Sequence, residues 1–224
     1  MRPWILLDSA SVPGEGSELR LYQRGDEFTI KSGYADLMNS RKHGSEDALA
    51  EHTCVRLADC SKARLLIGGL GMGFTLSAAL QHIGEQGQVV VAELVPAVVS
   101  WNRGPLGEHS GYPLDDSRVS VREGDVARFI KGEQQAYDAI LLDVDNGPEG
   151  LTRKENDWLY SISGLNAAYA ALRPQGVLAV WSAGPDKNFV QRLRKVGFEV
   201  EETRVHAHGK KGARHIIWFA RRVV

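Results

Sequence analysis

The sequence predicts an α/β fold: a doubly wound, mostly parallel seven-stranded sheet with a C-terminal antiparallel hairpin and a small N-terminal β segment. Three observations predict it. From residue 64 onward, short apolar runs alternate with helical segments. The first of these runs, Leu65–Ile67, ends in a cluster of glycines. Two β-type runs close the chain with no helix between them. Regular βα alternation builds a parallel sheet with helices on both faces, and a terminal hairpin adds antiparallel strands at one edge.

Residues 1–40 are predicted to form a β-hairpin segment that is distinct from the domain at residues 41–224. Leu19–Gln23 and Phe28–Lys31 alternate apolar and polar side chains on either side of a polar turn that contains Gly25. A hairpin of this size cannot bury a core of its own. We therefore expect it to pack on the main domain or on a second copy of the chain.

The main domain is expected to begin with a helix at Glu46–Ala58, for which Ser45 is the predicted N-cap. A single long helix is expected at Leu159–Leu172, before Pro174. The other expected helices run from the glycine cluster to Ile83 and over Val95–Asn102, Val126–Lys131 and Asn188–Val196, and the expected strands are Leu65–Ile67, Gln88–Ala92, Arg118–Val121, Ala139–Leu142, Val177–Trp181, Phe198–Val205 and His215–Ala220.

Composition excludes several classes of protein. The chain has 224 residues, of which 43% are hydrophobic, but it has no apolar run long enough to span a membrane. Its formal net charge of −1 gives no overall nucleic-acid footprint. Cys54 and Cys60 have no companion pair, so neither a zinc site nor a disulfide scaffold is predicted. We expect a cytoplasmic protein without a metal, a nucleic-acid partner or a membrane partner.

Residues able to bind a ligand follow each of the first four expected strands. The first strand leads into Gly68, Gly69, Gly71 and Gly73, whose lack of Cβ atoms permits a sharp turn close to a ligand. Glu93 follows the second strand, Asp125 the third, and Asp143 and Asp145 the fourth. A carboxylate in the position of Glu93 suits a ribose diol. Each acid also has a structural interpretation, as a solvated turn residue or, for Asp125, as a helix cap.

At these positions the chain resembles the spermidine synthase (polyamine aminopropyltransferase) branch of the S-adenosylmethionine-dependent methyltransferase folds. LLIGGLGMG is similar to the glycine-rich nucleotide loop of that branch, VVVAELVPAVV to its second strand, RVSVREGDVARFI to its third and YDAILLDVDNGPEGL to the strand that carries its active-site aspartate. The resemblance implies a Rossmann-like fold, a homodimer, and a site for S-adenosylmethionine or its decarboxylated form. It places Glu93 and Leu94 at the ribose, Asp125 and Val126 at the adenine, and Asp143 at the active-site aspartate.

The chain also departs from that branch. The polyamine synthases carry an aspartate in the glycine loop that holds the charged amine of the aminopropyl group, and here Gly71 occupies this position. The upstream segment that carries a glutamine in the family is replaced by LMNSRKHGS. The nucleotide half of the family's site is therefore recognisable, whereas the acceptor half differs from a putrescine site.

These features predict a transferase, most favourably one that moves a methyl group to a small amine or another polar acceptor. Asp143 would orient or deprotonate the acceptor, and Asp145 would assist it. The alternatives are aminopropyl transfer from decarboxylated S-adenosylmethionine to a diamine, a non-catalytic nucleotide-binding member, and a nicotinamide-linked oxidoreductase, which would also use a glycine turn and a following acid.

Candidate acceptor-binding residues are His43, His52 and Tyr160. Arg41 and Trp158 are further candidates for lining the acceptor pocket. His206, His208 and His215 do not share metal-ligand spacing with a carboxylate or a cysteine, and they are interpreted as part of a solvated hairpin.

Overall fold

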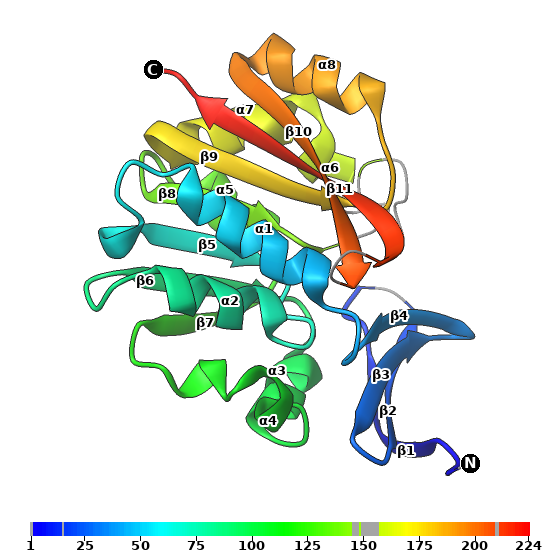
Figure 1. Cartoon of the computed structure of the whole chain (residues 1–224). Helices are drawn as coiled ribbons and strands as arrows, with labels where there is room; N and C mark the ends of the chain where they lie inside the picture. Colours follow the sequence, from blue (N-terminus) through cyan, green and yellow to red (C-terminus); the bar gives the residue numbers. More distant parts are fainter. Residues whose placement is uncertain (1, 15, 145–147, 149–156, 209–210) are drawn as a thin grey trace.

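The computed structural model describes the chain except residues 1, 15, 145–147, 149–156 and 209–210. It consists of a seven-stranded sheet between two layers of helices, with a smaller antiparallel sheet at one side (Figure 1). The strand order of the large sheet is β10-β11-β9-β8-β5-β6-β7. Strands β5 to β9 pair in parallel, and β11 is antiparallel to both β9 and β10. The predicted fold class is confirmed.

The strands of the large sheet are β5 (Arg64–Gly68), β6 (Gln88–Glu93), β7 (Val119–Glu123), β8 (Tyr137–Leu142), β9 (Leu172–Ser182), β10 (Phe198–His208) and β11 (Lys211–Arg222). The helices are α1 (Gly44–Val55), α2 (Phe74–His82), α3 (Pro96–Arg103), α4 (Gly107–Ser110), α5 (Val126–Lys131), α6 (Asp157–Tyr160), α7 (Ile162–Ala171) and α8 (Lys187–Val196). Single turns of 3₁₀ helix lie at Cys60–Lys62 and Pro113–Asp115.

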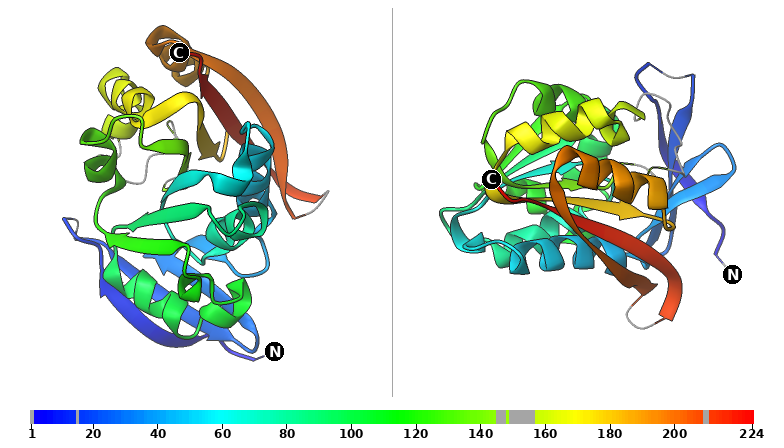
Figure 2. Two further views of the ribbon diagram at one scale, coloured as in Figure 1. Left: turned by 90° about the vertical axis from the view of Figure 1, so that its left-hand side faces the viewer. Right: turned by 90° about the horizontal axis from the view of Figure 1, so that it is seen from above.

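Alternation along the strands divides the core between the two faces of the sheet. Leu65 and Ile67 of β5 belong to a buried cluster with side chains of α1, α2 and α3, whereas Leu66 belongs to a second cluster with α5, α7 and α8. The views from the side and from above show these two helical layers (Figure 2). Because both faces are covered, β6 can be almost entirely apolar.

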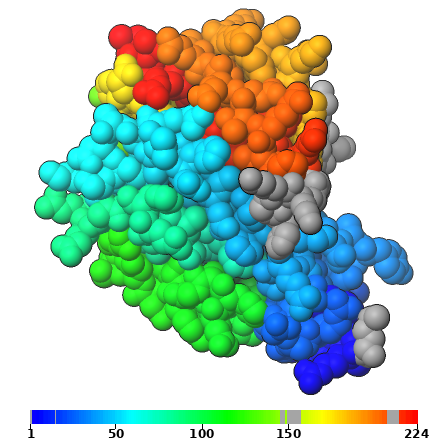
Figure 3. Space-filling view, in the orientation of Figure 1, coloured from blue at the N-terminus to red at the C-terminus, as the bar shows by residue number. Residues whose placement is uncertain are grey.

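The N-terminal segment contains more structure than the predicted hairpin. Its four strands, β1 (Ile5–Ser11), β2 (Glu18–Arg24), β3 (Glu27–Ser32) and β4 (Ala35–Asn39), form an antiparallel sheet in chain order. This sheet forms a lobe beside the main domain (Figure 3). Leu21, Phe28 and Ile30 join the buried cluster of the main domain, so the lobe shares the main core as its small size requires.

Two local predictions were wrong. The helix expected over Leu159–Leu172 is interrupted at Ser161, whose hydroxyl accepts a hydrogen bond from the Gly164 N–H and caps a new helix, α7. In the observed arrangement, a Cβ on Gly164 would lie 2.0 Å from the Trp158 carbonyl oxygen, so the junction between the two helices depends on glycine there. Ser45 is not the N-cap of α1, because the helix begins one residue earlier, after His43.

Candidate functional site

Two adjoining cavities open at the carboxyl ends of the central strands, where β5 lies between β6 and β8. The strand-end cavity has a volume of about 350 Å³, and it lies between the ends of β6 to β8 and the N-terminal sheet. The helix-end cavity, of about 430 Å³, lies between the starts of α1 and α2 and the strands β9 and β11. Both are lined by Leu37, Met38, Gly71, Asp143 and Val144. These shared residues make the two cavities neighbouring parts of one site.

The glycine loop separates the two cavities and depends on its glycines for different reasons. Gly69 and Gly71 line the site with φ angles of +89° and +54°. A Cβ on Gly69 would lie 2.5 Å from the Asp143 carbonyl oxygen, so the loop passes this backbone at a distance that only glycine permits. Gly68 and Gly73 line neither cavity. Their Cβ atoms would meet side chains of the core and of α3, so they allow close packing of the loop.

Glu93 anchors the glycine loop through a hydrogen bond to its backbone. Its side chain is only 7% exposed, and its two carboxylate oxygens accept hydrogen bonds from the backbone N–H groups of Leu70, at 2.9 Å, and Val95, at 2.8 Å. Burial raises the pKa of this carboxyl group, and the backbone hydrogen bonds oppose that rise. Glu93 thus ties β6 to the glycine loop while it lines the strand-end cavity beside Leu94.

Asp125 both caps a helix and lines a cavity. It is the N-cap of α5, where Oδ1 accepts a hydrogen bond from the Ala127 N–H at 2.8 Å. Asp125 and the following Val126 also line the strand-end cavity, next to Gly124. The helix cap fixes the carboxylate in place at the cavity wall. Its structural role is therefore compatible with contact to a ligand.

Asp143 lies where the two cavities meet. Its backbone N–H donates to the Gly68 carbonyl at 3.0 Å, which continues the β5–β8 pairing past the end of the strand. The Thr75 hydroxyl donates to Oδ2 at 3.2 Å. Burial raises the pKa of Asp143 to about 7, with a further contribution from the negative charge of Glu46. Asp143 is thus able to exchange a proton near neutral pH.

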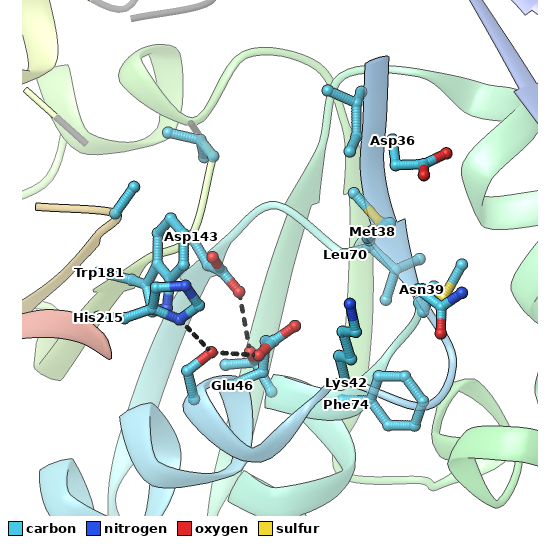
Figure 4. A pocket seen from close by; sticks show the side chains of 17 residues that line it. Asp36, Met38, Asn39, Lys42, Glu46, Leu70, Phe74, Asp143, Trp181 and His215 are labelled. Carbon is cyan, nitrogen blue, oxygen red and sulfur yellow. Dashed lines mark hydrogen bonds between the residues drawn. The ribbon is translucent and has the colours of Figure 1, made fainter. Parts of the chain in front are cut away.

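Glu46 is the residue of the site that sequence reasoning missed. The sequence predicts it only as the first residue of a helix, but it lines the helix-end cavity with Asp143 (Figure 4). Burial raises the pKa of Glu46, and a hydrogen bond from Ser45 opposes this rise. The negative charge of this partly buried carboxyl group on α1 therefore contributes to the raised pKa of Asp143 at the end of β8.

Ser45 and His215 complete this end of the site. The Ser45 hydroxyl donates to Glu46 Oε2 at 2.6 Å, and His215 Nδ1 lies 3.0 Å from Ser45 Oγ. The His215 ring packs edge-on against Trp181, with 4.6 Å between the ring centroids. His215 therefore lies at the wall of the cavity and outside the tip of the hairpin. The pairing of β9 with β11, which brings Ser182 opposite Ile216, places it there.

The structure does not bring the three predicted acceptor-binding residues to these cavities. His43 stacks on Phe74 at 4.2 Å and hydrogen-bonds Asp47, on the far side of that ring. His52 faces Phe219 from α1, and Tyr160 is buried against Phe189. Arg41 forms ion pairs with acids of the N-terminal sheet, and Trp158 lies under the Lys131 ammonium group. Asp145 lies outside the described residues.

Two further searches concern the described residues only. Within them, we find no group of three or more His, Cys, Asp or Glu side chains arranged to hold a metal ion. Nor does any of the helices described combine the length and apolar character needed to cross a membrane.

Comparison with known proteins supplies the family. The model of the spermine/spermidine synthase domain matches residues 48–203, which is more than half of the chain. This chain belongs to the spermine/spermidine synthase domain family. The matched region includes the glycine loop, Glu93, Asp125 and Asp143, whereas Ser45, Glu46 and His215 lie outside it.

Relatives in this family carry two kinds of name. Polyamine aminopropyltransferase 1 of Streptomyces coelicolor is 30% identical over 125 residues, which cover 55% of this chain and 23% of that protein. Putrescine N-methyltransferase 2 of Nicotiana attenuata is 31% identical over 195 residues, which cover 78% of this chain and 50% of that protein. The chain thus spans half or less of the length of these relatives. As their names state, both transfer a group to an amine, and the family is one of transferases.

Solved structures agree on the fold. The spermidine synthase from Thermotoga maritima superposes with a TM-score of 0.77 at 17% identity, covering 97% of this chain and 72% of that one. A spermidine synthase in complex with the transition-state analogue AdoDATO gives a TM-score of 0.76 over the same shares. The similarity extends over the N-terminal lobe as well as the main domain, because almost the whole chain is covered.

Proposed function

We propose that this protein transfers an aminopropyl group from decarboxylated S-adenosylmethionine to the nitrogen of an amine. The observation that carries the proposal is the pair of partly buried carboxyl groups, Glu46 and Asp143, that line the helix-end cavity. Transfer of an aminopropyl group brings two amines to one place, the acceptor and the tail of the donor. Each is recognised by a carboxylate.

Glu46 can replace a carboxylate that the glycine loop lacks. The aspartate that would hold the donor amine is replaced by Gly71, so the glycine loop itself has no carboxylate in that position. Glu46 lines the same cavity as Gly71 but arrives from α1. It therefore offers a second carboxylate from another element of the fold. The names of the relatives support aminopropyl transfer better than the methyl transfer that the sequence favoured.

The strand-end cavity fits the adenosyl part of the donor. Glu93 and Asp125 present carboxylates fixed by backbone hydrogen bonds, and Leu94 and Val126 provide apolar surface beside them. We assign the ribose hydroxyls to Glu93 and the adenine amino group to Asp125. The bound donor supplies a carbon made electrophilic by its sulfonium. The protein's part is then to position the acceptor and to accept its proton.

We assign to Asp143 the role of accepting the proton from the attacking amine. An amine attacks as the neutral base, and the product nitrogen must lose a proton after the new bond forms. A carboxyl group with a pKa of about 7 can hold the ammonium form of the acceptor and take its proton within the physiological range. Thr75 fixes the carboxylate through its hydroxyl group.

Methyl transfer from S-adenosylmethionine is the second candidate, and two observations favour it. Met38, rather than an acid, faces Gly71, with its sulfur 3.3 Å from where a Cβ would be. The Lys42 side chain also lines the helix-end cavity (Figure 4), where it can pair with the carboxylate that S-adenosylmethionine retains.

The test is a donor-by-acceptor matrix read by mass spectrometry. The protein is incubated with either donor and with putrescine, cadaverine or spermidine, and both the amine product and the nucleoside by-product are measured. Aminopropyl transfer yields methylthioadenosine, and methyl transfer yields S-adenosylhomocysteine. We expect methylthioadenosine from the decarboxylated donor. S-adenosylhomocysteine alone would favour the second candidate, and neither by-product would contradict both proposals.

A further inference from the structure

We propose that Ser45 and His215 form a proton relay that carries the acceptor's proton from the Glu46–Asp143 pair toward solvent. This inference rests on the proposed transfer to an amine, and it holds for either alkyl group. It assigns a role to two residues that the fold brings together from opposite ends of the chain: Ser45 lies in the first turn of α1, and His215 lies on β11, 170 positions later.

Hydrogen bonds form a path from Glu46 through Ser45 to His215. Glu46 Oε2 lies 2.6 Å from Ser45 Oγ, which lies 3.0 Å from His215 Nδ1. Both distances fall within the range for hydrogen bonds through which protons move. Ser45 is 1% exposed, so its hydroxyl is shielded from water and exchanges protons chiefly with these two partners. His215 is only partly buried and lies at the outer end of the path.

A relay is needed because of where the proton is released. As the acceptor nitrogen bonds to carbon, the carbon–sulfur bond breaks and its electron pair stays on sulfur, which leaves the product nitrogen with an extra proton. Asp143 takes this proton and passes it to Glu46, whose carboxyl group lines the same cavity. Asp143 lines both cavities, so a bound donor and acceptor lie between its carboxyl group and bulk water. The pair must lose it before another acceptor can be deprotonated.

For each proton that Glu46 passes to Ser45, His215 releases one proton to water. The protonated Glu46 carboxyl group donates to Ser45 Oγ while the Ser45 hydroxyl proton passes to His215 Nδ1. His215 then carries protons on both ring nitrogens and releases the Nε2 proton to water. Burial lowers the pKa of His215, so its ring is neutral at neutral pH and ready to accept. No oxidant, reductant or further reactant is needed.

The surroundings of His215 contain charges of both signs. Glu46 faces it from α1, Asp143 from the end of β8 and Lys42 from the segment before α1, since all of them line the same cavity. Arg214 precedes it on β11, and His206 is the partner of Arg214 on β10. Of these groups, Glu46 is the one joined to His215 through a hydroxyl group.

Stopped-flow proton release tests the relay. Wild-type protein, Ser45→Ala and His215→Ala are mixed with donor and amine in weak buffer containing a pH indicator, and alkyl transfer is followed in parallel by quenched flow. In the wild type we expect proton release to keep pace with transfer. In both variants it should lag by about 10²-fold, the lower end of the range for lost acid–base assistance.

Conservative variants and controls separate a relay from a structural role. Ser45→Thr keeps a hydroxyl group and should restore proton release, and added imidazole should restore it in His215→Ala. His82→Ala, at the end of α2, and Ser120→Ala, exposed on β7, are matched controls that should match the wild type. Nitrogen NMR of the ligand-free protein gives a readout independent of turnover, because Ser45→Ala should change the tautomer balance and pKa of His215.

The outcomes are distinct. Release that keeps pace with transfer in both Ser45→Ala and His215→Ala, with unchanged pH–rate profiles, would overturn the relay while leaving the transferase function intact. A wild type without turnover on any donor and amine would instead contradict the proposed function. In that case an unchanged His215 NMR titration in Ser45→Ala would overturn the hydrogen-bonded path itself.

Discussion

The two cavities of the site hold their carboxyl groups in different ways. In the strand-end cavity, each acid accepts hydrogen bonds from backbone N–H groups. Glu93 accepts from Leu70 and Val95, and Asp125 accepts from Ala127. In the helix-end cavity, Asp143 and Glu46 accept hydrogen bonds from the hydroxyl groups of Thr75 and Ser45, and the charge of Glu46 raises the pKa of Asp143. The backbone thus fixes the first pair in place, whereas the protonation of the second pair is adjustable.

This difference suits a division between binding and chemistry. Carboxylates that accept backbone N–H bonds are preorganised acceptors for a nucleoside. A carboxyl pair with coupled titration suits proton transfer near neutral pH. Substitutions in the two cavities should therefore change different measurements, and the following predictions run from the largest expected effect to the smallest.

Asp143→Asn should reduce turnover by about 10²–10⁴-fold, the range typical of a lost general base. Donor affinity should remain within a few-fold, because we assign the nucleoside contacts to Glu93 and Asp125. Single-turnover rates and calorimetric titration measure the two effects. Asp157→Asn, at the exposed first residue of α6, is the matched control. Full activity in Asp143→Asn would remove Asp143 from its proposed role.

Glu93→Ala should destabilise the protein by about 1–3 kcal/mol for each backbone N–H group that loses its partner. The glycine loop would lose its tie to β6, so donor affinity should fall together with the unfolding free energy. Urea denaturation and calorimetry report the two quantities. A variant with unchanged stability would contradict the role assigned to the hydrogen bonds from Leu70 and Val95.

Two substitutions of Asp125 separate its role as a helix cap from its proposed contact with the donor. Asp125→Ala should lose about 1 kcal/mol of stability, because α5 loses its N-cap, and it should also lose donor affinity. Asp125→Asn keeps a good cap, so its stability should stay near that of the wild type while donor affinity falls by about tenfold. Equal donor affinity in Asp125→Asn and the wild type would leave Asp125 with the cap alone.

The pH dependence should follow the Asp143–Glu46 pair. The rate should rise with pH through about 7 as Asp143 ionises. Glu46→Gln removes the neighbouring negative charge, so it should lower the pKa of Asp143 and move the rise to lower pH. Stability has the opposite slope. A carboxyl group whose pKa is raised on folding favours the folded state below the unfolded pKa of about 4 and loses that contribution as pH rises through about 7.

Wild-type unfolding free energy should therefore decline between pH 4 and pH 7 more steeply than that of Asp143→Asn. Denaturation curves at a series of pH values provide the measurement. Identical slopes for the two proteins would contradict the raised pKa, and an unmoved rate profile in Glu46→Gln would contradict the coupling of the pair.

The strand-end cavity could be predicted from the sequence because its parts are local. Each acid follows its strand directly, and parallel strands bring their carboxyl ends to one edge of the sheet. Glu93, Asp125 and Asp143 thus came together as expected. The N-cap and backbone bonds of these acids also depend on residues within a few positions or on the adjacent loop.

The helix-end cavity could not be predicted in the same way. Ser45 and Glu46 match the pattern of a helix start, and that pattern contains no sign that β11 will bring His215 to them. His43 was chosen for its place in the loop before α1, but its ring stacks on the outer side of Phe74. A sequence signal for Glu46 does exist, because it is an acid at the first position of the expected helix Glu46–Ala58.

Calorimetric titration of the wild-type protein with methylthioadenosine, S-adenosylmethionine and decarboxylated S-adenosylmethionine tests the central claim most directly. All three share the adenosyl part that we assign to Glu93 and Asp125. Saturable one-to-one binding of methylthioadenosine, weakened in Asp125→Asn and retained in Asp143→Asn, is the result we predict. Absence of binding by all three compounds would contradict the assignment of the strand-end cavity and the transferase function built on it.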